Sequence, residues 1–324
     1  MIKYKFLGKT GIKVSNLCFG TMSFGGAADV ETSKAMFNHC REAGINFFDC
    51  ADVYNNGRSE EILGQCIKEC RNELVITTKG FGQMGSDINS KGLSRRHIKL
   101  AIEESLMRLG TDRVDIYFAH HFDNATPIED TLRVLDDLVH EGKILYLGVS
   151  NWSAWQIEKA LGISAKQGLS SFACIQPMYS LVKRQAEVEI LPMADEEELG
   201  MITYSPLGAG LLTGKYMNAN KVDSGRLIES EMYKKRYSED NYSKVAERLV
   251  TYSKERGIIP ASLAIAWVMA NQSVTAPIIG ARNVKQLEVS LAATDINMTD
   301  EWRNEISLLS IEPPSPTDRT EELK

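Results

Sequence analysis

The sequence predicts a single (β/α)₈ barrel with an N-terminal β-hairpin and extra C-terminal helices. Two observations favour this fold. Short, continuous apolar runs of strand length alternate with stretches of helical periodicity, and eight such runs occur. Continuous apolar runs are typical of strands that are buried on both faces, as in a parallel sheet. Eight strand–helix units close most simply into a barrel, although an open, doubly wound sheet also fits the alternation.

The expected strands are short and end in polar residues or glycine. They are Leu17–Gly20, Asn46–Asp49, Leu74–Lys79, Val114–Ala119, Lys143–Ser150, Phe172–Gln176, Met201–Ser205 and Val274–Gly280. Helical periodicity lies between them, at about 29–43, 58–70, 94–109, 127–141, 153–167, 183–198 and 239–271. Pro260 is expected to divide the last block, because proline suits the start of a helix and not its interior.

The ends of the chain and two long loops complete the expected organisation. Tyr4–Leu17 alternates around two glycines and is expected to form a hairpin that closes the bottom of the barrel. The barrel is expected to span residues 1–310, and the Pro-rich, charged residues 311–324 to form a poorly ordered tail. The loops Gly80–Gly92 and Met217–Glu239 are long enough to be functional lids.

Composition excludes several classes of function. The net charge is −6 and no block of Lys or Arg occurs, so nucleic-acid binding has little support. No apolar stretch is long enough for a signal peptide or a membrane span. The six cysteines form no CxxC pair and no compact ligand cluster, so we expect reduced thiols, a cytoplasmic protein and no metal.

Polar residues at the ends of the expected strands form a chemically coherent group. In a (β/α)₈ barrel the C-terminal ends of the strands carry the active site. The residues at these ends are Asp49, Lys79, His120, Ser150, Asn151, Gln176, Tyr204, Ser205 and Gly280. Each alone has an ordinary structural explanation, such as a turn cap, a solvated lysine or a loop histidine. Together, an acid, a lysine and a histidine at successive strand ends, with Tyr54 nearby, predict acid catalysis.

A tyrosine next to a lysine can serve as a general acid. A free phenol has a pKa near 10, and a neighbouring cation lowers it. Lys79 is placed to act on Tyr54 in this way, Asp49 to keep Lys79 charged, and His120 to hydrogen-bond a substrate oxygen. No strong nucleophile or metal site is present, so the harder chemistry would come from a cofactor. A carbonyl and a proton donor together indicate hydride transfer.

Of three glycine-containing segments, two are candidates for binding phosphate. Gly80–Gly85 matches GxGxxG, but the expected helix begins only near Ser94, so we interpret it as a loop and not a dinucleotide fingerprint. Tyr204–Gly210 is a Gly-rich loop after the seventh strand, and Ile278–Asn283 leads from the eighth strand into a helix. The start of a helix near this end of a barrel favours phosphate, and Arg282 adds a charged fork.

The motifs and their order resemble those of the aldo-keto reductase superfamily across about residues 4–300. The matching segments are Gly44–Gly64, Val75–Lys79, Val114–Asp123, Gly148–Asn151, Gln176–Tyr179, Tyr204–Tyr216 and Pro277–Gln286. The detail is most similar to the branch that contains potassium-channel β-subunits and bacterial reductases. This resemblance implies a TIM barrel that binds NADPH without a Rossmann domain.

The resemblance also implies a role for individual residues. Tyr54 would be the proton donor of a tetrad with Asp49, Lys79 and His120. The cofactor would be held at its nicotinamide end by Gly20, Thr21, Met22, Asp49, Ser150, Asn151, Gln176 and Tyr204. Its pyrophosphate would meet Ser205, Leu207 and Gly210, and its 2′-phosphate end would meet Gly280, Arg282 and Gln286.

The sequence departs from the family pattern at a few positions. Cys50 replaces the usual threonine after the catalytic aspartate, and Val289 and Ser290 replace the Glu-Asn that holds adenine. His121 is an alternative to His120 by adjacency, but the spacing from Asp115 and Tyr117 favours His120.

Three functions fit these residues. The first is NADPH-dependent reduction of an aldehyde or ketone to an alcohol. The second is an NADPH-binding regulatory or redox-sensing subunit with little turnover, and the third a lyase with Lys79 as a Schiff base. Phe24, Tyr54, Phe81, His121 and Phe122 are expected to line the pocket. The substrate and the oligomeric state stay open.

Overall fold

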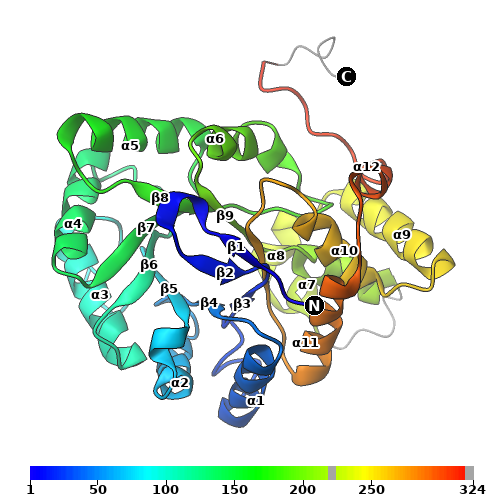
Figure 1. Cartoon of the computed structure of the whole chain (residues 1–324), viewed down its shortest axis with the longest axis horizontal. Helices are drawn as coiled ribbons and strands as arrows, with labels where there is room; N and C mark the ends of the chain where they lie inside the picture. Colours follow the sequence, from blue (N-terminus) through cyan, green and yellow to red (C-terminus); the bar gives the residue numbers. More distant parts are fainter. Residues whose placement is uncertain (218–223, 318–324) are drawn as a thin grey trace.

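The computed structural model describes residues 1–217 and 224–317, and eight parallel strands form a closed barrel in it. The order around the barrel is β10-β3-β4-β5-β6-β7-β8-β9, and β9 pairs with β10 to close it. The expected (β/α)₈ fold is therefore confirmed and the open sheet is excluded. Figure 1 looks along the barrel from the side of the N-terminal hairpin, with the helices arranged around the strands.

The barrel strands are β3 (Cys18–Gly20), β4 (Phe47–Asp49), β5 (Val75–Gly80), β6 (Val114–Ala119), β7 (Ile144–Ser150), β8 (Phe172–Gln176), β9 (Gly200–Thr203) and β10 (Ala276–Ile279). The helices are α1 (Val30–Glu42), α2 (Arg58–Ile67), α3 (Arg95–Leu109), α4 (Ile128–His140), α5 (Ala154–Gln167), α6 (Ile190–Glu196), α7 (Arg226–Glu229), α8 (Glu231–Arg236), α9 (Asp240–Glu255), α10 (Pro260–Met269), α11 (Val284–Leu291) and α12 (Asp300–Ser307).

Local sequence signals set most helix ends. The Asp29 side chain accepts a hydrogen bond from the backbone N–H of Thr32 at 2.8 Å and so caps the start of α1. Pro260 occupies the first turn of α10 and separates it from α9, as expected. The helix expected over 183–198 is shorter, because only a 3₁₀ turn at Gln185–Glu187 and α6 form there.

The N-terminal hairpin closes one end of the barrel. Strands β1 (Tyr4–Phe6) and β2 (Lys13–Ser15) pair antiparallel and lie across that end in Figure 1. Leu7, between them, is fully buried in the cluster that fills the barrel interior. Gly8 lies so close to the backbone at β9 that an added Cβ would be 2.6 Å from the Gly200 nitrogen. The hairpin therefore leaves only the opposite end open for a ligand.

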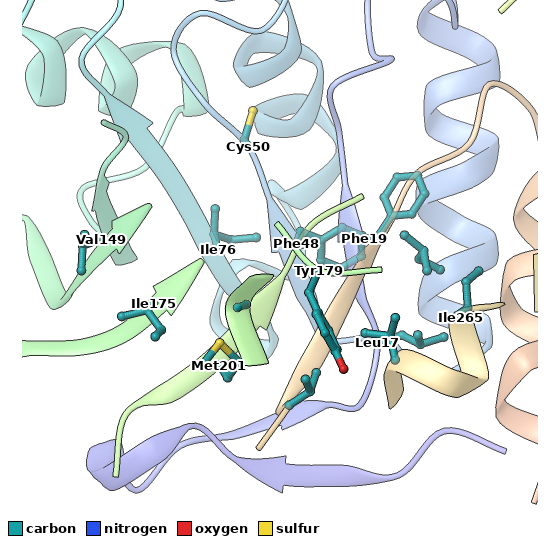
Figure 2. Close-up of a cluster of buried hydrophobic side chains, with 14 of the residues drawn as sticks. Leu17, Phe19, Phe48, Cys50, Ile76, Val149, Ile175, Tyr179, Met201 and Ile265 are labelled. Carbon is teal, nitrogen blue, oxygen red and sulfur yellow. The ribbon is translucent and has the colours of Figure 1, made fainter. Parts of the chain in front are cut away.

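Apolar side chains cover both faces of the strands, one layer inside the barrel and one layer outside it, because successive side chains of a strand point to opposite faces. The inward layer includes Leu7, Phe47, Val75, Phe118 and Cys174. The outward layer packs under the helices, and Figure 2 shows part of it: Phe19, Phe48, Ile76, Val149, Ile175 and Met201 from the strands, with Ile265 from α10. Any inward residue beyond the interior layer therefore faces the open end, which we call the mouth.

The two expected lid loops differ in structure. Residues 81–94 contain no helix or strand, and the backbone N–H of Gly92 donates to the Phe81 carbonyl at 2.8 Å. The second loop contains α7 and α8, and its residues 218–223 lie outside the described residues. In the tail, residues 311–317 form no helix or strand, and residues 318–324 are not described. No helix in the described ranges is long and apolar enough to cross a membrane.

Candidate active site

Side chains alternate between the two faces of a strand, and this alternation places the candidate catalytic residues directly above the apolar interior of the barrel. On β5, Val75, Thr77 and Lys79 share one face, and Val75 belongs to the interior layer. The same alternation carries the interior residues Phe47 to Asp49 on β4 and Cys174 to Gln176 on β8. Residues far apart in sequence are thus brought to one end of the barrel.

Lys79 is the centre of the site. Its side chain is fully buried, and its ammonium forms a salt bridge with Asp49 Oδ2 at 2.6 Å. The same nitrogen donates to the Cys50 carbonyl at 2.6 Å and lies 3.2 Å from the Tyr54 hydroxyl. Burial lowers the pKa of Lys79, but the charge of Asp49 and the hydrogen bonds to it and Tyr54 outweigh burial and raise that pKa above its usual value. Lys79 therefore stays protonated.

Asp49 is held by residues of the neighbouring strand β5 and of β8, which is not adjacent to β4 in the barrel. Its second oxygen, Oδ1, accepts hydrogen bonds from Thr77 Oγ1 and from Gln176 Nε2, both at 2.8 Å. Asp49 is 2% exposed, so these hydrogen bonds satisfy a carboxylate that water does not reach freely. Gln176, which sequence reasoning assigned to the cofactor, thus also orients Asp49. Thr77 was missed, although it lies two residues before Lys79 on the same face.

Tyr54 lies on the turn between β4 and α2, which we call the Tyr54 turn (residues 50–57). Asn55, Asn56 and Gly57 have φ values of 49°, 54° and 84°, a left-handed conformation that asparagine and glycine tolerate best. The Asn55 side chain donates to the carbonyls of Met22 and Phe24 at 3.0 and 2.7 Å. These bonds fix the turn against the loop after β3.

The pKa of the Tyr54 hydroxyl is set by two opposing effects, burial and the charge of Lys79. Burial raises its pKa to about 12, although the charge of Lys79 and the hydrogen bond from it act in the opposite direction. Lys79 therefore lowers the pKa of Tyr54, as expected, but does not overcome the larger effect of burial. The physical reason is the desolvation of a phenolate at a half-buried position among apolar neighbours. At neutral pH the hydroxyl keeps its proton.

His120 is next to the Tyr54 ring, with the two ring centroids 6.4 Å apart in an edge-on arrangement. Its pKa is far below the usual value because of burial first, and then because of the positive charge of Lys79. The imidazole is therefore neutral at pH 7 and can donate one hydrogen bond. His121 stacks on His120 at 4.9 Å and is exposed, which agrees with the choice of His120 as the inner residue.

Four further candidates form a hydrogen-bonded belt around the mouth. Asn151 has a φ of 61° and donates to the His120 carbonyl at 2.9 Å and to Ser150 Oγ at 3.0 Å. Ser150 donates to the Gln176 carbonyl at 2.9 Å. The Tyr204 hydroxyl donates to Asn151 Oδ1 at 2.7 Å. The ends of β6, β7, β8 and β9 are therefore linked by side chains that could exchange these partners for a ligand amide.

The residues after β3 support the reactive end from the other side. Thr21 is buried, and both its backbone N–H and its hydroxyl donate to the Asp49 carbonyl, at 2.9 and 3.1 Å. Gly20 pairs with Asp49 in the sheet, and an added Cβ would lie 2.7 Å from Ile278 Cγ2. Met22 contributes its carbonyl to Asn55. These three positions thus lie beside Asp49 and the Tyr54 turn.

The loop after β9 has the backbone of an anion-binding turn. Ser205, Gly208, Ala209 and Gly210 all have positive φ, between 54° and 90°. Leu207, at φ −94° and ψ 5°, precedes Gly208 and gives a right-handed to left-handed alternation. Such alternation turns successive N–H groups toward one concave face, which suits a phosphate. The loop therefore fits the pyrophosphate that the sequence assigned to it.

The segment after β10 could bind a phosphate ester, but its arginine already pairs with a carboxylate. Asn283 caps α11 by accepting from the Gln286 N–H at 3.0 Å, and Gln286 Oε1 accepts from the Arg282 N–H at 3.0 Å. Gly280 is exposed at the start of this segment. The Arg282 guanidinium pairs with Glu229 at 2.8 Å, so a phosphate must displace or share this carboxylate.

Some expectations about the pocket need correction. Phe24 is fully buried and packs on Phe19 with ring centroids 5.8 Å apart, so it does not line the mouth. Ser290, at the position where the family carries an adenine contact, is 3% exposed and its hydroxyl points to its own helix. Phe122 contacts two tryptophans: its ring centroid lies 4.9 Å from that of buried Trp152 and 6.2 Å from that of Trp155, which is 61% exposed.

Comparisons with known proteins identify the family and several relatives of the chain. The model of the aldo/keto reductase family matches residues 16–310. The chain is 40% identical over 303 residues to a probable voltage-gated potassium channel subunit beta of Arabidopsis thaliana, covering 91% of this chain and 92% of the relative. It is 36% identical over 312 residues to an uncharacterized oxidoreductase of Bacillus subtilis, covering 93% of each. A putative channel subunit beta of Schizosaccharomyces pombe is 35% identical, covering 91% of this chain and 88% of the relative.

Proposed function

The chain belongs to the aldo/keto reductase family, and from this premise we propose that it reduces an aldehyde or ketone to an alcohol with NADPH. One observation carries the proposal: a protonated tyrosine lies 3.2 Å from a buried ammonium, which in turn is held by a buried carboxylate at 2.6 Å. This chain of contacts points a proton donor toward the mouth and stabilises the charge that the donor leaves behind.

Each residue of the tetrad has a distinct part in the proposed reaction. Tyr54 donates its proton to the carbonyl oxygen as negative charge develops there. Lys79 stabilises the resulting phenolate, and Asp49 keeps Lys79 charged and oriented. Neutral His120 donates a hydrogen bond to the same oxygen. The cofactor, when bound, supplies the hydride.

The binding of NADPH is part of the proposal. The backbone turn at Leu207–Gly210 suits the pyrophosphate, and Arg282 at the start of α11 suits the 2′-phosphate. Ser205, Gly280 and Gln286 lie in the same two segments. Asn151, Ser150 and Gln176 provide amide and hydroxyl groups at the nicotinamide end, next to Gly20, Thr21 and Met22, and Tyr204 provides a ring.

Tyr54→Phe tests the reductase proposal. We expect it to lower kcat by about 10²- to 10⁴-fold, the usual contribution of a positioned general acid, and to leave the NADPH Kd nearly unchanged. Turnover of NADPH and of NADH should be followed at several aldehyde and ketone concentrations, and NADPH binding by its fluorescence. Tyr4→Phe, which removes the same hydroxyl from an exposed tyrosine of the N-terminal hairpin, is the control for handling and folding. Full activity in Tyr54→Phe would refute the acid assignment.

A second function has a specific observation in its favour: relatives carry the name of channel subunits beta. In this alternative the chain binds NADPH as a regulatory or redox-sensing subunit with little turnover. Both functions require cofactor binding, so only multiple turnover separates them. A single oxidation of bound NADPH, with no further cycles in excess NADPH and carbonyl, would favour the subunit.

The Schiff-base lyase is disfavoured by the surroundings of Lys79. An amine must be neutral to attack a carbonyl, and the Asp49 carboxylate raises the pKa of Lys79 despite burial. For the cellular compartment we propose the cytoplasm, since all six cysteines are free and four of them are buried.

A further inference from the structure

The helix α8 ends next to the loops after β8 and β9 and carries a guanidinium that the proposed chemistry does not use. Tyr237, directly after α8, is 6% exposed, and its hydroxyl lies 3.8 Å from the Met178 sulfur, just beyond β8. An added Cβ on Gly208, in the loop after β9, would lie 3.6 Å from the Tyr237 ring. The end of α8 is therefore anchored against the loops that follow β8 and β9.

Arg236, the last residue of α8, is half-buried and rests on its own helix. Its guanidinium carbon lies 5.2 Å from the centroid of the Tyr233 ring, and Nη2 lies 3.7 Å from the Met232 sulfur. Within residues 1–217 and 224–317, no carboxylate lies within ion-pair distance of Arg236. A partly desolvated guanidinium without an acidic partner is unusual, since arginine is normally paired when it leaves water.

Arg236 lies beside the loops that follow β8 and β9, because the next residue, Tyr237, packs against Met178 and Gly208. The charge acts on His121 after β6, on Lys183 after β8 and on Tyr204 after β9. In each case burial has the larger effect on the pKa, and the guanidinium lowers the pKa further or opposes the rise. Charges interact over about 10 Å or less at moderate ionic strength. The ring of the adjacent Tyr237 lies 5.6 Å from Lys183 Nζ, which also places the end of α8 beside the loop after β8.

We propose that Arg236 forms an anion subsite at the mouth, so that the preferred substrates are aldehydes or ketones that carry a carboxylate. This inference rests on the reductase function proposed above and names the substrate class for the same site. A guanidinium suits a carboxylate because its N–H groups match both oxygens in a bidentate pair. The apolar body of such a substrate has Phe81, whose ring lies 5.3 Å from His121, as an aromatic neighbour.

Two substrates that differ only in charge test the proposal. 4-Carboxybenzaldehyde carries the carboxylate, and methyl 4-formylbenzoate is its neutral ester. We expect wild-type protein with NADPH to prefer the acid in kcat/KM. Arg236→Gln should lower kcat/KM for the acid by about ten- to hundredfold, as for the loss of a charge-assisted hydrogen bond, and change that for the ester by less than about twofold.

Matched controls separate this subsite from other effects of charge. Lys235→Gln removes one positive charge from the neighbouring, exposed position of α8 and should leave both substrates unchanged. Arg236→Lys should keep part of the preference, since the charge remains without the bidentate fork. The preference of the wild type should also fall as salt increases.

The outcomes distinguish the two levels of the proposal. Titration calorimetry of the same two aldehydes into protein loaded with NADP⁺ measures recognition without turnover. Selective binding of the acid that is lost in Arg236→Gln supports the subsite even if no turnover occurs, in which case the reductase function fails. Equal losses for acid and ester, or a weaker NADPH Kd in Arg236→Gln, would assign Arg236 to structure or to the cofactor and overturn the anion subsite.

Discussion

Removal of the buried ammonium tests the electrostatic centre of the site. Lys79→Met keeps much of the side-chain length but leaves Asp49, which is 2% exposed, without its cation. Breaking a buried ion pair by removing one partner costs about 3–5 kcal/mol of the free energy of unfolding. Asp49 keeps the hydrogen bonds from Thr77 and Gln176, so we expect a loss near the lower end, about 3 kcal/mol.

Removing both charges should restore much of this loss. In the double variant Asp49→Asn with Lys79→Met, no uncompensated charge is buried, and replacing a whole buried pair is often close to neutral. We therefore expect the double variant to be more stable than Lys79→Met by at least about 2 kcal/mol. Lys9→Met, which breaks an exposed pair with Glu198, should change stability little and serves as the matched control.

The pH dependence of the free energy of unfolding provides an independent test of the same reasoning. In Lys79→Met a buried carboxylate has lost its cation, and burying an unpaired charge costs far more than burying a neutral acid. Lys79→Met should therefore lose more stability, relative to the wild type, at pH 8 than at pH 4.5, and the double variant should lack this difference. Urea unfolding between pH 4.5 and pH 8, read by tryptophan fluorescence and circular dichroism, measures both. A loss below about 1 kcal/mol, or no gain in the double variant, would refute the reasoning.

Two further predictions concern positions outside the tetrad. Burial and the neighbouring Glu60 raise the pKa of Asp52 to about 7, so this group destabilises the fold as pH rises from its unfolded pKa near 4. Asp52→Asn should remove up to about 4 kcal/mol of the stability that the wild type loses as pH rises. If the urea midpoints of the wild type and of Asp52→Asn changed alike from pH 4.5 to pH 8, this prediction would be wrong. Gly148→Ala would place a Cβ 2.4 Å from the Phe118 ring, and should cost about 1–3 kcal/mol. Gly162→Ala, with nothing within 4 Å in α5, should instead stabilise by about 0.5–1 kcal/mol; the opposite order of thermal midpoints would contradict this comparison.

Much of the fold was predictable because its signals are local. Continuous apolar runs identified the barrel strands, and the two-residue period of β5 already implied that Lys79 continues the inward face of Val75. Pro260 marked the start of α10 for a reason contained in one residue. The helix expected near residue 190 is shorter than its periodicity suggested, and the loop expected over 217–239 contains α7 and α8.

The sequence predicted which residues form the candidate site better than it predicted their contacts. Strand ends indicated Asp49, Lys79 and His120, the position of Tyr54 shortly after Asp49 added the proton donor, and the family resemblance assigned the same four residues. Their partners were not visible: Gln176 donates to Asp49 across 127 positions of sequence, and no local pattern encodes that contact. Phe24, expected at the mouth, is buried on Phe19, because the fold of the loop after β3 decides which way an aromatic side chain points.

The sequence by itself determined the eight strand–helix units, the inward face of each strand and the residue types at the strand ends. These follow from periodicity and from the rule that parallel strands end together. Only the tertiary structure decided that burial outweighs the charge of Lys79 in setting the pKa of Tyr54, and that Gln176 donates a hydrogen bond to Asp49. The physical reason is that desolvation and charge depend on distances between residues remote in sequence, and these distances exist only once the barrel has closed.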